Sequence, residues 1–205
     1  MRKKKPGGII MALFEKAVEF ALKAHEGQKR KDGGIFFLHP MEVASIAGTM
    51  TQDENVIIAG ILHDTVEDTD VTAEDILREF GPRIAELVAS ETEDKRPEMA
   101  ASDSWQIRKE ESLEFLADTK DEGIKMLWLS DKLSNIRALA REEAELGESI
   151  FNRFNEKNPV KQRWYFSTIA ELTSSLSSQE AYNEYVSLVH RVFDKYAEDG
   201  GNLNV

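Results

Sequence analysis

One segment of this 205-residue chain, residues 54–64, constrains the fold more than any other. If it is helical, it is apolar on nearly every side, through Val56, Ile57, Ile58, Ala59, Ile61 and Leu62. Asp53, just before it, can accept hydrogen bonds from the first backbone N–H groups of the helix. A helix that is apolar all round must be covered by other parts of the protein. We therefore predict a central, buried helix.

Elsewhere, apolar residues recur at the spacing of three and four that is typical of amphipathic helices. Further helices are predicted at residues 12–24, 73–80, 82–90, 103–118, 121–146, 159–175 and 179–196. The intervening loops are expected at residues 26–38, 65–71, 92–103 and 147–158. No convincing period-two strand is seen, although residues 34–38 could form a short extended piece. The predicted fold class is all-α.

The boundary between two of these helices carries specific signals. Thr72-Ala-Glu-Asp75 is a variant of the capping box, in which the two polar side chains satisfy backbone N–H groups. Gly81 can end the helix that follows, and Pro82 suits the first turn of the next one. We expect two short consecutive helices here.

The length favours a single domain, which we place at residues 12–198, with flexible tails at 1–11 and 199–205. Met1-Arg-Lys-Lys-Lys5 resembles the charged start of a signal peptide, but the apolar stretch that follows stops at Glu15. That stretch is too short for an export signal. The first residues are therefore expected to be a tail, or to precede a start at Met11.

The composition limits the partners. A net charge of −12 argues against a general nucleic-acid or anionic-membrane binder, because phosphate groups favour clustered Lys and Arg. The sequence contains no run of about twenty apolar residues, which is the length that a membrane-spanning helix needs. The chain has no cysteine, which excludes thiolate ligands and agrees with a reducing cytoplasm. We expect a cytoplasmic protein that does not bind nucleic acid or membranes, and a homo-oligomer is compatible with this expectation.

The chemistry begins with His63-Asp64, at the end of the most apolar helix. Burying an imidazole and a carboxylate is costly unless each has a partner, and one divalent cation satisfies both. The alternative is a hydrogen-bonded pair that only ends the helix.

Asp131 lies on an otherwise apolar helical stripe. Helical spacing places it, with Asn135 one turn later, in line with Ile124, Leu127, Trp128 and Ala138. An enclosed carboxylate needs a cation or several hydrogen-bond donors. Pairing with Lys132 or Arg137 is the alternative, although those side chains are expected to point elsewhere on the helix.

His39 precedes Pro40, which should hold it extended just before a new helix. A histidine there can be a simple cap. Together with His63, Asp64 and Asp131 it completes a set of two histidines and two aspartates, which suits manganese or another divalent first-row metal.

The run His63-Asp-Thr-Val-Glu-Asp68 follows Arg30-Lys31-Asp32 and His39-Pro40 and precedes Asp131-Lys-Leu-Ser-Asn135. In this order and spacing, residues 17–165 resemble the HD-type hydrolase domain of the RelA/SpoT family, and more closely its small stand-alone alarmone hydrolases. The resemblance implies an HD-domain helix bundle in which His39, His63, Asp64 and Asp131 bind Mn²⁺. It also implies that Glu67 and Asp68 are the acid/base pair and that Asn135 contacts the substrate.

Simple chemistry agrees with the roles of Glu67 and Asp68. Each follows a proposed ligand by four residues, in the expected loop after the central helix, where it could orient a water molecule and protonate a leaving oxygen. A solvated acidic turn is the alternative, because Asp70, Glu74 and Asp75 are close by.

Phosphate recognition is expected from Lys29-Arg-Lys31, with Arg30 and Lys31 as the first substrate-binding candidates. Lys95, Lys161 and Tyr165 resemble family positions that meet nucleotide phosphates and sugar. The sequence departs from the family at Lys161, where arginine is common, and at Gly33-Gly-Ile-Phe-Phe37, where a Pro-Tyr pair is typical. The contacts with the base could therefore differ.

By this resemblance, the chain would hydrolyse guanosine 3′,5′-bis(diphosphate) or its pentaphosphate, the alarmones of the stringent response, to GDP or GTP and pyrophosphate. Metal-activated water would be the nucleophile. The synthetase half of long RelA/SpoT proteins would not fit beside this domain, so hydrolysis is the only direction expected. The alternatives are an HD phosphatase for another nucleotide or for NADPH, and a degenerate nucleotide-binding regulatory module.

Overall fold

The computed structural model describes residues 7–31 and 33–196, with side chains from Ala12 onward. The chain divides into two compact units, Met1–Thr92 and Glu93–Val205, which we describe separately. Within the described residues, extended pairing is confined to one isolated bridge between Lys29 and Ile35. The all-α prediction is confirmed, and the bridge lies at one end of the short extended piece expected at residues 34–38.

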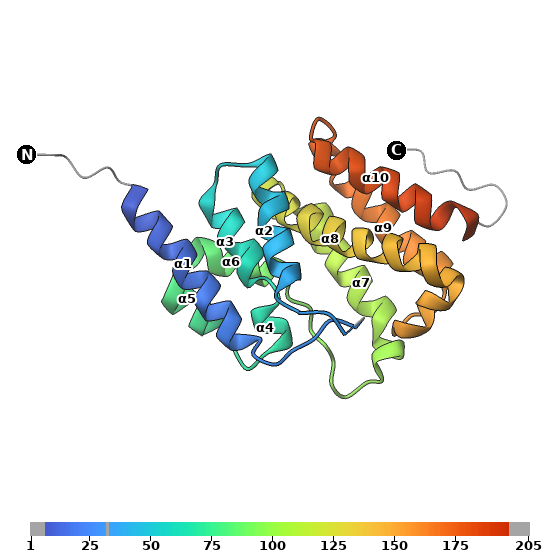
Figure 1. Ribbon diagram of the computed structural model, residues 1–205, viewed down its shortest axis with the longest axis horizontal. Helices are drawn as coiled ribbons and strands as arrows, with labels where there is room; N and C mark the ends of the chain where they lie inside the picture. The colour runs from blue at the N-terminus through green and yellow to red at the C-terminus, as the bar shows by residue number, and fades with distance from the viewer. Residues whose placement is uncertain (1–6, 32, 197–205) are drawn as a thin grey trace, which may run out of the picture. The chain divides into compact units, whose positions relative to one another are not determined.

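The first unit is built around α3 (Glu54–Leu62), the predicted central helix (Figure 1). The other helices of this unit are α1 (Gly7–Ala24), α2 (Leu38–Met50), α4 (Thr65–Asp68), α5 (Ala73–Phe80) and α6 (Pro82–Glu91). Helix α3 packs against α1, α2 and α6, and its residues from Ile58 to Leu62 are all buried. A Cβ at Gly60 would lie 3.0 Å from the backbone N and Cα of Ala44, so this glycine permits the close approach of α2. That approach brings the start of α2 to the end of α3.

The structure corrects the expectations for His39 and for residues 65–68 in this unit. His39 is not extended before a helix, because it lies in the first turn of α2. The first backbone N–H groups of a helix have no partner within it, so Pro40 costs no hydrogen bond there. Residues 65–68 are not a loop either, because they form α4, directly after His63 and Asp64. A one-turn helix has too few residues to show a hydrophobic period.

The junction of α5 and α6 follows the sequence signals. The Thr72 hydroxyl accepts a hydrogen bond from the Asp75 N–H, and the Asp75 carboxylate accepts one from the Thr72 N–H, so the capping box is complete. The bonds from the Thr72 backbone and hydroxyl, and then that from Arg78, lower the pKa of Asp75 to about 2. Gly81 has a φ of 85°, which favours glycine, and Pro82 opens α6.

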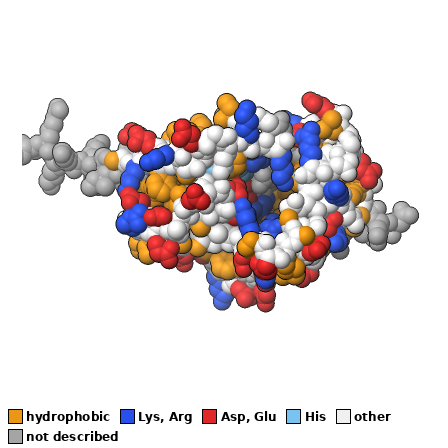
Figure 2. All heavy atoms as spheres, turned by 90° about the horizontal axis from the view of Figure 1, so that it is seen from below, with side chains coloured by type: hydrophobic (Ala, Val, Ile, Leu, Met, Phe, Trp, Pro, Cys, Tyr) orange, Lys and Arg blue, Asp and Glu red, His pale blue; other side chains and the backbone are white. Residues whose placement is uncertain are grey.

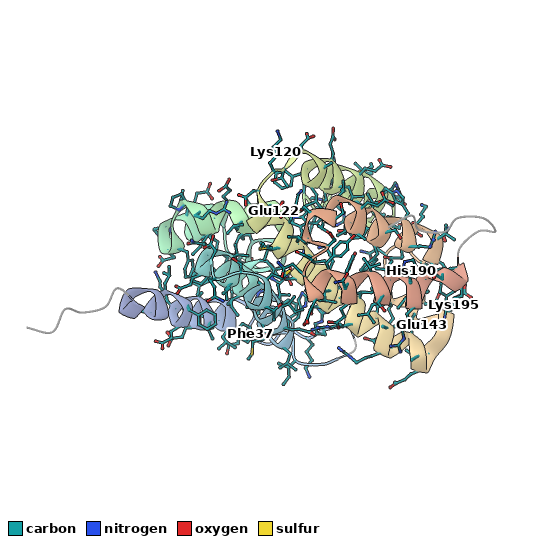
Figure 3. All side chains as sticks on the ribbon, turned by 90° about the horizontal axis from the view of Figure 1, so that it is seen from above. Phe37, Lys120, Glu122, Glu143, His190 and Lys195 are labelled. Atoms are coloured by element: carbon teal, nitrogen blue, oxygen red, sulfur yellow. The ribbon has the colours of Figure 1, made fainter. Side chains whose placement is uncertain are left out.

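The second unit contains the longest described helix, α8 (Glu122–Leu146). Its other elements are α7 (Ala101–Asp118), η1 (Gly147–Arg153), α9 (Pro159–Leu172), η2 (Ser174–Leu176), α10 (Glu180–Phe193) and η3 (Asp194–Tyr196). Helix α10 packs along α8, where Arg137 binds the Glu184 carboxylate at 2.7 and 2.6 Å. Lys195, labelled in Figure 3, pairs with Glu143 of α8.

Aromatic side chains fill the interior of this unit. The Phe166 ring lies 5.5 Å from that of Phe193 and 6.4 Å from that of Tyr185. Burial raises the pKa of Tyr185 well above its ordinary range, and its hydroxyl donates to the Phe166 carbonyl oxygen at 2.8 Å. Trp105 is also buried. These rings hold α7, α9 and α10 as one packed body.

At the amino end, α1 begins at Gly7, although a tail through residue 11 was expected. Nothing between Ile9 and Ala24 breaks a helix, so the helical backbone extends back past the predicted start. Residues 1–6 and the expected tail at 199–205 lie outside the described residues. The single-domain assignment stays a prediction.

Of the helices described, none combines the length and apolarity needed to cross a membrane. Figure 2 shows Lys and Arg side chains interspersed with Asp and Glu on one face, although the net charge of the sequence is −12. Cationic groups are therefore available locally to an anionic ligand.

Candidate metal and catalytic site

Two buried histidines meet where α2 starts and α3 ends. His39 is 5% exposed and His63 is 2% exposed. Their Nε2 atoms lie 3.3 Å apart, with the rings nearly perpendicular. The close packing at Gly60 therefore brings two predicted ligands, 24 residues apart in the sequence, to one point.

The proton on His63 can be placed from its surroundings. Its Nδ1 lies 3.0 Å from the Gly60 carbonyl oxygen, which can only accept a hydrogen bond, so Nδ1 carries the proton. In the neutral ring, Nε2 then presents a lone pair. This lone pair faces Oδ1 of Asp64 at 3.1 Å, and Oδ2 of Asp64 lies 3.7 Å from Nε2 of His39. Two acceptors this close repel each other unless positive charge lies between them.

A metal ion fits this arrangement. Imidazole nitrogens and carboxylate oxygens lie about 2.0–2.2 Å from a bound first-row ion, so neighbouring ligand atoms are roughly 3.0–3.6 Å apart. The separations of 3.1, 3.3 and 3.7 Å among His39, His63 and Asp64 are close to this range. The Gly60 carbonyl supplies the outer hydrogen bond that typically fixes a ligating histidine.

In the second unit, Asp131 is buried on α8, as its stripe predicts. Its Oδ1 accepts a hydrogen bond from Nδ2 of Asn135 at 2.7 Å. Its other oxygen pairs with Lys132, so the expectation that Lys132 points elsewhere was wrong. The long lysine stem curls back, and its ammonium also lies 4.9 Å from the centre of the Trp128 ring. Arg137 pairs instead with Glu184.

Glu67 and Asp68 lie on α4 rather than in a loop. Glu67 is half-buried and Asp68 is exposed. The Asp68 N–H donates to the Asp64 carbonyl oxygen at 2.9 Å, so the acidic pair follows Asp64 by one helical turn. Residues three and four apart on a helix share a face. Both carboxylates therefore lie on α4, the short helix that directly follows His63 and Asp64.

The predicted phosphate-binding residues Arg30 and Lys31 lie in a tight turn. We call residues 29–31 and 33–35 the basic turn. The Arg30 N–H donates to the Gly34 carbonyl oxygen at 3.0 Å and the Gly33 N–H to the Arg30 carbonyl oxygen at 2.8 Å. The Lys29–Ile35 bridge closes the turn, and Lys31 is exposed. Ile35, in the stretch 33–37 where the sequence is expected to depart from the family, is 68% exposed.

The remaining substrate candidates belong to the second unit. Lys95 is exposed between α6 and α7. Lys161 is exposed in the first turn of α9 and pairs with Glu156 at 3.0 Å. Tyr165, one turn later, is buried, with its ring centre 6.1 Å from that of Trp105. The roles proposed for these residues stay predictions.

Sequence reasoning missed a buried charge cluster beside Lys95. The Glu93 carboxylate accepts hydrogen bonds from Arg108 at 2.8 Å, Lys109 at 2.7 Å and Ser112 at 3.1 Å. Burial by itself would raise the pKa of Glu93, but Lys109 holds it below its ordinary value of 4.5. The signal in the sequence was the pair Arg108-Lys109, which lies in a helix between Trp105 and Leu113, two apolar residues that are buried.

Replacing Glu93 with glutamine should lower the free energy of unfolding by about 3 kcal/mol, because the buried cations lose their anion. A carboxyl group with a lowered pKa stabilises the fold above its unfolded pKa, and this contribution is lost as the pH falls through the folded pKa. The difference from the wild type should therefore be full above pH 4.5 and shrink below it. Urea unfolding at several pH values measures this.

The matched control is Glu111→Gln, because Glu111 pairs with Arg96 of the same segment but is half exposed. Glu111→Gln should lower the free energy of unfolding by less than about 1 kcal/mol. Equal losses in the two variants, or a Glu93 effect that does not vary with pH, would show that the buried cluster contributes nothing special.

The family comparison identifies the fold that holds these residues. A model described as the HD domain matches residues 17–160, which is more than half of the chain. GTP pyrophosphokinase rsh of Brucella melitensis is 38% identical over 137 residues, covering 66% of this chain and 18% of that protein. The guanosine-3′,5′-bis(diphosphate) 3′-pyrophosphohydrolase of Aquifex aeolicus is 38% identical over 126 residues, covering 62% and 18%. This chain thus spans about a fifth of the length of these relatives.

Solved structures agree. The crystal structure of lmo0812 from Listeria monocytogenes EGD-e is 32% identical, has a TM-score of 0.66, and covers 76% of this chain and 99% of its own. A metazoan orthologue of SpoT, described as hydrolysing ppGpp, has a TM-score of 0.68 at 24% identity, covers 93% and 97%, and shows likeness in fold. The chain belongs to the HD-domain family, as a RelA/SpoT hydrolase-like member.

Proposed function

We propose that this protein is a metal-dependent hydrolase that removes pyrophosphate from the 3′ position of guanosine tetra- or pentaphosphate and leaves GDP or GTP. The observation that carries the proposal is the convergence of His39, His63 and Asp64, in which Nε2 of His63 lies 3.1 Å from the Asp64 carboxylate and 3.3 Å from Nε2 of His39. Such a set of acceptors is suited to a divalent cation. The names of the Aquifex aeolicus relative and of the metazoan SpoT orthologue support the substrate class.

His39, His63 and Asp64 would hold the ion, with Asp131 as the fourth ligand. Asp131 is assigned because it is a buried carboxylate of ligand type and because the resemblance to the RelA/SpoT hydrolase domain implies a ligand at this position. A set of two histidines and two carboxylates accommodates Mn²⁺, which we propose as the physiological ion. When bound, the ion would neutralise charge on the phosphoryl oxygens and make an attacking water more acidic.

The acidic pair on α4 would move the protons. In hydrolysis, a water oxygen attacks the phosphorus that carries the 3′ oxygen, and the bond from that phosphorus to the 3′ oxygen breaks. We assign Glu67, half-buried and one turn beyond His63 and Asp64, to accept the proton of the attacking water. Asp68 would deliver a proton to the departing 3′ oxygen. Transfer by such positioned groups typically contributes about 10²–10⁴ in rate.

The remaining contacts would orient a polyanion. Arg30 and Lys31, on the basic turn, would supply cations within the same unit as the two histidines. Lys95 and Lys161 would bind further phosphates, and Tyr165 would pack against the sugar. Asn135 donates one N–H to Asp131, a proposed ligand, and the rest of its amide would contact the substrate.

The test is a panel of substrates with the metal-stripped protein to which Mn²⁺ has been added back. We expect release of pyrophosphate with GDP or GTP from the alarmones, and loss of that activity on adding a chelator. Turnover of NADPH or ordinary nucleotides instead would identify a different HD phosphatase. Nucleotide binding without turnover of any substrate would identify a regulatory module.

A further inference from the structure

Helix α4 carries the proposed acid/base pair but cannot stabilise itself. It spans only Thr65–Asp68. Helices of one turn are unstable alone, because forming the first turn fixes many torsion angles for a single hydrogen bond. The last carbonyl groups of such a helix also lack partners within it. The positions of Glu67 and Asp68 therefore depend on contacts from outside α4.

One such contact comes from the turn after α1. Nε2 of Gln28 donates to the backbone carbonyl oxygen of Asp68 at 2.8 Å, across 40 residues of sequence. This bond satisfies the final carbonyl of α4. The Thr69 hydroxyl adds a bond to the Thr65 carbonyl oxygen at 2.6 Å, so the end of the short helix is tied twice.

The direction of the Gln28 bond determines which ring nitrogen of His25 carries the proton. A carbonyl oxygen only accepts, so the amide of Gln28 must turn its NH₂ to Asp68 and its Oε1 the other way. Oε1 lies 2.9 Å from Nδ1 of His25, which therefore carries the ring proton. Nε2 of His25 is buried with no hydrogen-bond partner, which suits an unprotonated nitrogen better than an N–H group. The two hydrogen bonds therefore run in one direction: His25 donates to Gln28, and Gln28 donates to Asp68.

His25 also touches the base of the basic turn. Its ring lies 4.4 Å from that of Phe36, tilted by 32°, and both residues are buried. Phe36 directly follows Ile35, which pairs with Lys29 to close the turn. The same histidine therefore connects the turn that bears Arg30 and Lys31 to the bond that holds α4.

We propose that Gln28, oriented by His25, is a positioning residue that fixes the acid/base pair on α4 relative to the basic turn. The inference rests on the proposed function for its catalytic consequence. Phosphoryl transfer requires the bound phosphate and the proton-transfer groups at set distances, and a misplacement of about 1 Å can cost about 10²-fold in rate. Arg30 and Lys31 do not depend on this bond for their charge, so loss of the bond should affect turnover more than binding.

The first test is Gln28→Leu, which removes both hydrogen bonds at similar volume. We expect kcat for alarmone hydrolysis to fall about 10- to 100-fold, with KM changed less than about threefold and bound manganese unchanged. In the substrate-free protein, the Asp68 amide should exchange with solvent at least about tenfold faster, because α4 opens more often. Gln52→Leu is the control, since Gln52 is an exposed glutamine of the same unit and should change none of these values.

A second variant, Gln28→Glu, separates the two bonds. Its carboxylate can still accept from Nδ1 of His25 but cannot donate to the Asp68 carbonyl. We expect the ¹⁵N shifts of His25 to keep the Nδ1-protonated pattern, while Asp68 exchange and kcat change as in Gln28→Leu. In Gln28→Leu the His25 pattern should move toward a mixture of the two ring forms.

The outcomes are distinguishable. Wild-type exchange at Asp68 in both variants, or unchanged kcat with intact folding, would overturn the positioning role. A wild-type protein that hydrolyses no alarmone, combined with faster Asp68 exchange in the variants, would contradict the proposed function but support the link between Gln28 and α4.

Discussion

Asp131→Asn should lose bound manganese and, with it, measurable pyrophosphate release. Asparagine keeps the size of the side chain and an oxygen that can accept from Nδ2 of Asn135, which lies 2.7 Å away in the wild type. It removes the negative charge that a divalent ion requires. Mutating residues that only hydrogen-bond to a metal ligand typically weakens metal affinity about 10- to 100-fold. Removing the charge of a ligand itself should therefore weaken the affinity for Mn²⁺ more than about 100-fold. Metal content after gel filtration and titration with Mn²⁺ measure this directly.

Glu145→Gln is the control for this variant, because it removes an exposed carboxylate from the same helix. It should keep wild-type metal content and rate. If Asp131→Asn retained the wild-type affinity for Mn²⁺, Asp131 would be a structural partner of Lys132 rather than a ligand. Circular dichroism at the assay temperature separates loss of metal from loss of fold.

Glu67→Gln should give the opposite pattern, with metal retained and rate lost. The side chain lies on α4, half-buried, outside the proposed set of ligands. Glutamine has the same shape but cannot accept a proton from water. We expect kcat to fall about 10²–10⁴-fold while the manganese content stays at the wild-type level.

Glu74→Gln is the matched control, since Glu74 is an exposed acidic residue in the first turn of α5 and has no proposed role. It should leave kcat unchanged. A Glu67→Gln protein with the wild-type rate would remove Glu67 from the reaction, and loss of metal in that variant would make it a ligand instead. Together with Asp131→Asn, the pair separates binding of the ion from transfer of the proton.

Several parts of the site could be read from the sequence because their signals are local. The apolar run of α3 predicts burial of its end, where His63 lies, and the stripe on α8 predicts burial of Asp131. The order of the motifs predicts the HD-domain family, which the match over residues 17–160 confirms. Each of these depends on residues within a few turns of one another, or on their order along the chain.

Other features depended on contacts that no local pattern encodes. Residues 65–68 carry too few positions for a helical period, and the Gln28 bond that satisfies the end of α4 comes from 40 residues away. The pairing of Lys132 with Asp131 reflects the freedom of a long side chain, which a helical projection does not describe. The Glu93 cluster forms because α7 presents Arg108 and Lys109 to a segment that looks like an ordinary polar loop.

The sequence by itself therefore determined the helical class, the buried central helix and the residue types of the candidate site. Only the tertiary structure decided which atoms face one another, above all the 3.1 Å and 3.3 Å separations around Nε2 of His63. The physical reason is one of range. Hydrophobic period and capping act between neighbours in the chain, whereas a metal site, a buried ion pair and the cap of a one-turn helix require groups that only folding brings together.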